Sequence, residues 1–122
     1  MPLDVARFGQ VFTPPKVVEF MLDLCANAGS VLEPSAGDGA FFNELRRRGR
    51  DVTGVELDPG VAPADARVMD FFNLPESERF ATIVGNPPYV RYQDIAPATR
   101  KRLASPLFDK RSNLFLFFIE KC

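Results

Sequence analysis

The chain has 122 residues, a formal net charge of −1, 46% hydrophobic and 25% charged residues, two cysteines and no histidine. This length allows one domain or part of one, and the composition is that of a globular protein without a membrane-spanning run. The first residues lack the basic and apolar segments of a secretory signal, so we expect a cytoplasmic protein. Because histidine is absent and Cys25 and Cys122 lie far apart, we expect no metal site.

Helices and short strands are predicted to alternate along the chain. After Thr13, which is placed to cap a helix, apolar residues at helical spacing predict a helix over residues 14–27, and Gly29 ends it. A short apolar run then predicts a strand over 30–33, and a second helix follows the glycine loop after that strand. Further strands are predicted over 51–57, 66–69 and 80–85.

The last third of the chain is expected to hold two helices. The tetrapeptide Asn86-Pro87-Pro88-Tyr89 ends the fourth strand, because two prolines cannot continue ladder pairing. A short helix is predicted around 98–103. A last helix, capped by Ser112, is apolar on nearly every side, so we expect it to be buried. Short strands alternating with helices predict an α/β, Rossmann-like doubly wound sheet with about four parallel strands.

The loop between the first strand and the second helix carries glycines and carboxylates. Gly37 and Gly39 let backbone N–H groups approach a ligand closely, and Glu56, at the end of the second strand, can accept both hydroxyls of a ribose. A dinucleotide site would need a third glycine, and Glu33 and Asp38 would repel its phosphates. These carboxylates suit S-adenosylmethionine, which has a positive centre and an amino group. An ordinary tight turn stays open as the alternative.

Two further motifs follow the third and fourth predicted strands. Asp70 offers an acceptor for an adenine amino group and Phe71 a ring for stacking, which favours a nucleoside cofactor. In the segment 86–89, the Asn86 side-chain oxygen and a carbonyl held by proline can accept both hydrogens of a planar amino group and free its lone pair for methylation. Tyr89 adds a stacking face for the substrate. The alternative is a Pro-Pro turn that ends a strand.

Charge is unevenly distributed along the chain. Residues 1–90 carry eight basic and 13 acidic side chains, a net charge of −5, whereas residues 91–111 carry six basic and two acidic side chains, a net charge of +4. Such a run is most often a solvated loop and helix face. It is also what an edge that contacts nucleic-acid phosphates requires.

Five segments together resemble the gamma-class N6-adenine DNA methyltransferases of restriction-modification systems. They are FGQVFTPP (8–15), VLEPSAGDG (31–39), GVELD (54–58), DF (70–71) and NPPY (86–89). The resemblance implies that Thr13 closes over the methionine part of S-adenosylmethionine, that Glu33 with Gly37, Asp38 and Gly39 holds its amino group and backbone, that Glu56 binds its ribose, and that Asp70 and Phe71 bind its adenine. It also implies double-stranded DNA as the partner, with the target adenine flipped out to Asn86, Pro87, Pro88 and Tyr89.

The same tetrapeptide occurs in methyltransferases that modify glutamine side chains of release factors and in RNA-directed relatives. The segments 8–15 and 112–115 favour the DNA-modifying class. A complete sheet of this fold has seven strands, whereas four are predicted here, and neither a second aromatic residue to sandwich the base against Tyr89 nor a target-recognition domain is evident. We therefore expect residues 1–122 to be the N-terminal part of a methyltransferase catalytic domain that needs a C-terminal segment or subunit, or else a non-catalytic interaction subunit.

Overall fold

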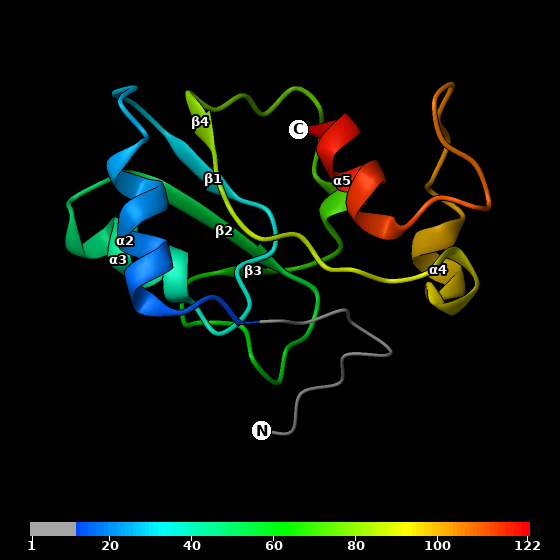
Figure 1. Cartoon of the computed structure of the whole chain (residues 1–122), viewed down its shortest axis with the longest axis horizontal. Coiled ribbons are helices and arrows are strands. Elements are labelled where there is room, and N and C mark those ends of the chain that lie inside the picture. The colour runs from blue at the N-terminus through cyan, green and yellow to red at the C-terminus, as the bar shows by residue number, and fades with distance from the viewer. Residues whose placement is uncertain (1–11) are drawn as a thin grey trace. The chain divides into compact units, whose positions relative to one another are not determined.

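The computed structural model describes residues 12–122 of the chain (Figure 1). Among these, Phe12–Asn86 form one compact unit, here called the sheet unit, and Pro87–Cys122 form the described part of a second, here called the C-terminal unit. Residues 8–11, which begin the first segment of the family resemblance, lie outside the described residues. None of the helices within 12–122 has the length and apolar character that crossing a bilayer requires.

The sheet unit is built on four parallel strands: β1 (Val31–Glu33), β2 (Val52–Glu56), β3 (Arg67–Val68) and β4 (Thr82–Ile83). Their order is β3-β2-β1-β4, and Val31 pairs with Val52 on one side and with Thr82 on the other. The chain steps outward from β1 to β3 and then returns to the opposite side of β1, so the strand order reverses between β1 and β4. The predicted parallel α/β sheet is confirmed, and ligands of such sheets bind at this reversal.

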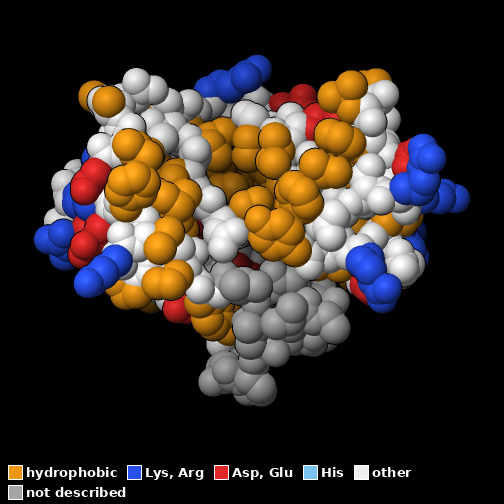
Figure 2. Space-filling model, viewed as in Figure 1, with side chains coloured by type: hydrophobic (Ala, Val, Ile, Leu, Met, Phe, Trp, Pro, Cys, Tyr) orange, Lys and Arg blue, Asp and Glu red, His pale blue; other side chains and the backbone are white. Residues whose placement is uncertain are grey.

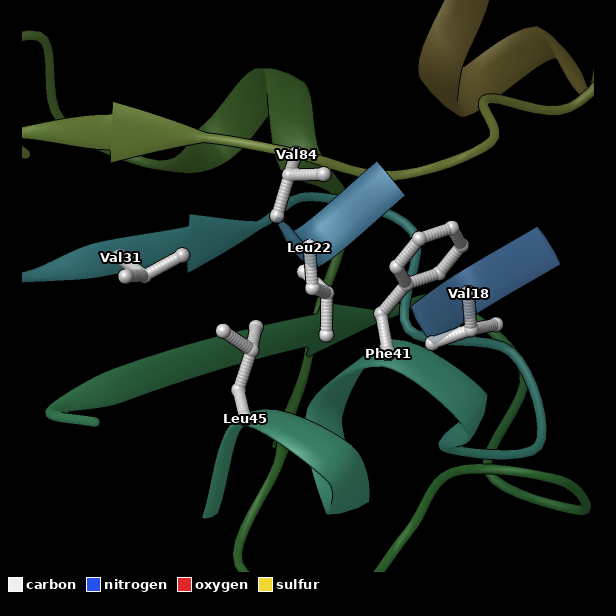
Figure 3. Close-up of a cluster of buried hydrophobic side chains, with 6 residues drawn as sticks. All are labelled: Val18, Leu22, Val31, Phe41, Leu45 and Val84. Carbon is white, nitrogen blue, oxygen red and sulfur yellow. The ribbon is translucent and has the colours of Figure 1, made fainter. Parts of the chain in front are cut away.

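Two helices, α2 (Pro15–Asp23) and α3 (Ala40–Arg47), are labelled in Figure 1, and side chains of both contribute to one apolar core with the sheet. Figure 3 shows the six side chains that form this core: Val18, Leu22, Val31, Phe41, Leu45 and Val84. Burial of each large side chain of this kind stabilises the fold by about 1.5–3 kcal/mol. Phe42 packs on the backbone of β2 at Gly54, where an added Cβ would approach its ring to 2.7 Å.

Part of the exposed face of α2 is apolar. Val17 and Phe20 in the helix and Leu24, its C-cap, expose 44%, 65% and 68% of their surfaces. Apolar side chains are correspondingly visible over the part of the surface where α2 lies (Figure 2). The buried positions of this helix are Val18 and Leu22, because a helix on one side of a sheet buries a single stripe of side chains.

Several predicted element boundaries are wrong. The predicted cap of the first helix, Thr13, is replaced by Pro14. At the other end of α2, the Leu24 N–H donates to the carbonyl three residues back at 3.2 Å, so the helix tightens and ends at Asp23 rather than near residue 27. Strands β3 and β4 have two residues each and are shorter than the ranges 66–69 and 80–85.

The C-terminal unit contains a 3-10 turn, η2 (Tyr92–Asp94), and two helices, α4 (Pro97–Arg100) and α5 (Leu114–Lys121). The predicted Ser112 cap of the last helix is wrong, because Asn113 caps it. The Oδ1 atom of Asn113 accepts from the N–H of Phe115 at 3.3 Å and from the N–H of Val90 at 2.9 Å. The second bond favours asparagine, because it ties the start of α5 to the segment that follows Tyr89.

The all-round burial expected of the last helix is also wrong. Leu114, Phe117 and Phe118 are buried, whereas Ile119 exposes 59% of its surface. Rings within the same unit pack on Phe117: the ring centroid of Phe108 lies 5.8 Å away and that of Tyr92 lies 6.4 Å away. The helix therefore has one buried and one exposed face, although its sequence is almost wholly apolar.

Candidate functional site

The carboxyl ends of β1, β2 and β4 bring together most of the residues predicted to bind a cofactor or substrate. Glu33 is the last residue of β1, Glu56 is the last residue of β2, and Asn86 follows β4 by three positions. The ladder continues past β4, because the Val84 N–H donates to the Leu32 carbonyl at 3.0 Å. This pairing places the end of β4 beside Glu33.

Glu33 is a carboxyl with no exposed surface. Its Oε1 accepts from the N–H of Ser35 at 3.2 Å and from the hydroxyl of Ser35 at 3.4 Å. Among residues 12–122, its Oε2 has no hydrogen-bond partner. Burial raises the pKa of Glu33 well above its usual value of 4.5; the Ser35 N–H opposes this rise and the negative charge of Glu56 adds to it. A buried acceptor of this kind is suited to a ligand that brings its own donor.

Gly85 makes room for this carboxyl. A Cβ added at Gly85 would lie 2.0 Å from Oε1 of Glu33, well inside van der Waals contact. Because Glu33 is fully buried, its carboxyl has little space into which it could move. The glycine before Asn86 is therefore needed for the Glu33 carboxyl to reach the end of β4.

The glycine loop and Glu56 are joined directly. The N–H of Gly37 donates to Oε1 of Glu56 at 2.8 Å, and the N–H of Asp58 donates to its Oε2 at 2.9 Å. Gly37 and Gly39 have φ values of 57° and 94°, in the region that favours glycine. Glu56 is 6% exposed. It thus fixes the loop, and the second lone pair of each carboxylate oxygen can accept a further hydrogen bond.

The structure gives Asp38, Asp70 and Phe71 local roles that the sequence did not predict. Asp38 is exposed and accepts from the N–H of Ala40 in the first turn of α3 at 3.1 Å. Asp70 accepts from the N–H of Phe72 at 3.0 Å and caps the short turn η1 (Phe71–Asn73). The Phe71 ring is 3% exposed, so the face expected to stack on an adenine is buried; the half-buried Phe72 ring lies 5.7 Å from it.

Asn86 is held by two hydroxyl side chains within the sheet unit. Its amide nitrogen donates to the Thr13 hydroxyl at 3.4 Å, and its backbone carbonyl accepts from the Ser35 hydroxyl at 3.2 Å. Thr13 was predicted to contact the cofactor, and the structure places it against the predicted catalytic amide. The amide nitrogen of Asn86 is thus directed to Thr13.

Within the C-terminal unit, Tyr89 exposes 51% of its surface, and its ring centroid lies 5.0 Å from that of Phe115. The next residue, Val90, is hydrogen-bonded through both of its backbone groups. Its carbonyl accepts from the Leu114 N–H at 2.8 Å, and its N–H donates to Oδ1 of Asn113 at 2.9 Å. The segment 112–115 therefore supports the end of the tetrapeptide.

Sequence reasoning did not predict four residues that shape the site: Ser35, Gly85, Asn113 and Phe115. The position of Gly85 directly before the tetrapeptide was a usable signal, as was the preference for asparagine as a helix cap. The roles of Ser35 and Phe115 depend on contacts distant in sequence. No local pattern reports them.

The fold is shared with a modification subunit assigned to a type I restriction enzyme of Vibrio vulnificus YJ016. The TM-score is 0.63 at 18% sequence identity, and the match covers 96% of this chain and 30% of that chain. The chain therefore has the α/β fold of a restriction-enzyme modification subunit. Residues 53–122 match the family model of the Eco57I restriction-modification methylases, and the chain belongs to this family.

Curated relatives are type II methyltransferases. The chain is 32% identical over 99 residues to M.HincII of Haemophilus influenzae, a match that covers 78% of this chain and 20% of the relative. It is 41% identical over 90 residues to M.TthHB8I of Thermus thermophilus, and this match covers 66% of this chain and 21% of the relative. The modification methylase CviBIII of a Paramecium bursaria Chlorella virus is 32% identical to this chain over 133 residues. This match covers 96% of this chain and 34% of the relative. The chain thus spans about a fifth of the length of the first two relatives.

Proposed function

We propose that this chain forms the cofactor site and the amino-group site of a DNA adenine-N6 methyltransferase that uses S-adenosylmethionine. The observation that supports it best is the meeting of Glu33 and Asn86 at the strand-order reversal between β1 and β4, with Ser35 bonded to both. A carboxyl for a cofactor amino group then lies beside an amide for a substrate amino group, within one unit of the fold.

The residues present fit the proposed cofactor. Glu33 offers an unpartnered buried oxygen to the cofactor amino group, and Glu56 keeps lone pairs for ribose hydroxyls. Asp70, the third proposed contact, would bind the cofactor adenine. It follows the carboxyl end of β3, as Glu33 and Glu56 stand at the carboxyl ends of β1 and β2. When bound, S-adenosylmethionine supplies a methyl group on a positively charged sulfur.

The chain's own residues would act on the substrate amino group. The Asn86 side-chain oxygen and the carbonyl of a following proline accept the two amino hydrogens, which draws the nitrogen toward tetrahedral geometry and frees its lone pair. Thr13 and Ser35 hold Asn86 for this task. Tyr89 offers an exposed ring face for the base. A paired adenine cannot reach such a site, so the base must be flipped from the duplex.

The basic stretch 91–111 is proposed to contact DNA phosphates. Two of its arginines are paired within the unit: Arg91 lies 2.8 Å from Asp94 and Arg111 lies 2.8 Å from Asp109. The exposed Lys101 and Lys110 form no salt bridge within the described residues. Binding through these charges should be salt-dependent and independent of sequence.

Methyl transfer from radiolabelled S-adenosylmethionine tests this function. The protein that carries this chain is incubated with duplex DNA, with RNA and with a glutamine-containing release-factor domain, and the labelled product is digested and identified. We expect label in DNA as N6-methyladenine. Label in RNA or in glutamine would contradict the proposed substrate and would favour the corresponding alternative. Label in cytosine would contradict the proposed adenine specificity.

The proposed ribose contact predicts that Glu56→Ala weakens S-adenosylmethionine binding by about 1.5–3 kcal/mol, the value of a hydrogen bond to a charged group. Calorimetric titration measures this loss, and Glu76→Ala, which removes an exposed carboxylate of the same unit, is the matched control. The 2′-deoxy analogue of the cofactor separates the ribose contact from loop anchoring. If Glu56 binds the ribose, the analogue loses affinity for the unaltered chain and loses much less for Glu56→Ala.

A further inference from the structure

Ser35 lies between the proposed cofactor carboxyl and the proposed catalytic asparagine. Its hydroxyl oxygen is 3.4 Å from Oε1 of Glu33 and 3.2 Å from the backbone oxygen of Asn86. A serine hydroxyl carries one hydrogen, so it can donate to one of these two acceptors at a time. The two bonds therefore compete.

Glu33 does not depend on this hydroxyl alone. The backbone N–H of Ser35 donates to the same Oε1 at 3.2 Å, so the carboxyl keeps one donor when the hydroxyl turns away. Ser35 reaches the Asn86 carbonyl through its hydroxyl. A ligand that brings its own donor to Glu33 should therefore shift the hydroxyl hydrogen toward the Asn86 carbonyl.

We propose that Ser35 is a positioning residue that couples occupation of Glu33 to the placement of Asn86. This inference rests on the proposed function. In the ligand-free chain the hydroxyl hydrogen is divided between the two acceptors. An ammonium group on Glu33 brings up to three donors and satisfies the carboxyl, so the hydroxyl then donates to the Asn86 carbonyl and fixes the backbone of the catalytic residue. The site would order its substrate-binding amide when the methyl donor is present.

The sequence allows a direct measurement of this bond. Asn86-Pro87 is the one Asn-Pro dipeptide of the chain. Labelling asparagine with carbonyl ¹³C and proline with ¹⁵N therefore gives a single carbon–nitrogen correlation, which reports the Asn86 carbonyl. Donation of a hydrogen bond to a carbonyl moves its ¹³C resonance downfield, so the signal reports the direction of the Ser35 hydroxyl without any need for turnover.

We expect the Asn86 signal of the full chain to move downfield when S-adenosylmethionine is added. The ligand 5′-methylthioadenosine, which lacks the amino-acid part, should not move it. Ser35→Ala should shift the ligand-free signal upfield and remove most of the response to S-adenosylmethionine, with a loss of cofactor affinity of about two- to tenfold. Ser35→Thr keeps the hydroxyl and should restore the response, and Ser30→Ala, at the other end of β1, should leave it unchanged.

Several results would overturn the coupling. The coupling is wrong if the unaltered chain and Ser35→Ala give the same Asn86 carbonyl signal. It is also wrong if S-adenosylmethionine moves this signal upfield, or if 5′-methylthioadenosine moves it as far as S-adenosylmethionine does. A failure of the unaltered chain to bind S-adenosylmethionine at all would instead contradict the proposed function. The two failures are distinguishable, because calorimetry reports binding while the carbonyl signal reports Ser35.

Discussion

Glu33→Gln is expected to raise the free energy of unfolding of the ligand-free chain at neutral pH and, in the same variant, to weaken S-adenosylmethionine binding. The loss of affinity should be at least about thirtyfold, or ~2 kcal/mol, because the variant removes the charged partner of a buried ammonium group and presents amide hydrogens to it. Stability and binding should therefore change in opposite directions.

The gain in stability follows from the pKa of Glu33, which burial raises well above 4.5. The folded chain keeps the proton on Glu33 to higher pH than the unfolded chain does. The stability that this group contributes is fully present below its unfolded pKa and is lost as pH rises through the raised folded pKa. Glutamine is neutral at every pH, so the variant should lack this fall.

Urea unfolding at a series of pH values above 4.5 measures the difference. Lower pH is avoided because hydrogen bonds from Arg47 and Arg48 lower the pKa of Glu44 to about 2, so its protonation adds a separate loss of stability in acid. Glu76→Gln, an exposed carboxylate of the same unit, is the control and should keep the slope of the unaltered chain. A variant at Glu33 that is less stable at pH 7, with an unchanged slope, would show that the carboxyl is ionised in the free chain.

Asn86→Ala is expected to lower the rate of methyl transfer by about 10²–10³-fold, the usual effect of removing one hydrogen-bonding group that acts in a transition state. Its effect on cofactor affinity should be far smaller, since the amide acts on the substrate nitrogen. Thr13→Ala removes the partner of the amide nitrogen and should give a smaller loss of rate, because Asn86 itself remains.

Single-turnover transfer to duplex DNA, measured with the protein that carries this chain, gives the rate, and calorimetry gives the cofactor affinity. Asn27→Ala is the matched control, because Asn27 follows α2 and its amide donates to the Ala81 carbonyl at 3.4 Å, before β4 rather than after it. Equal losses of rate and of cofactor affinity in Asn86→Ala would mean that Asn86 only supports the fold.

Local chemistry decided which parts of the site could be predicted. The glycines at 37 and 39 have the positive φ values that a tight loop requires, and the prolines after Asn86 end the fourth strand, as their lack of an N–H dictates. Element ends were predicted less well. The Asn113 cap prevailed over Ser112 because of a bond to Val90, 23 residues earlier in the chain.

The sequence by itself determined the order of strands and helices, the glycine loop and the presence of acceptors after each strand, because periodicity, glycine and proline act within a few residues. Tertiary structure alone decided that Phe71 is buried, that Glu33 has an oxygen without a partner among the described residues, and that Ser35 contacts Asn86. The last contact joins residues 51 positions apart. It depends on the register that pairs Leu32 with Ile83, and the register of two parallel strands is set by packing of the whole core.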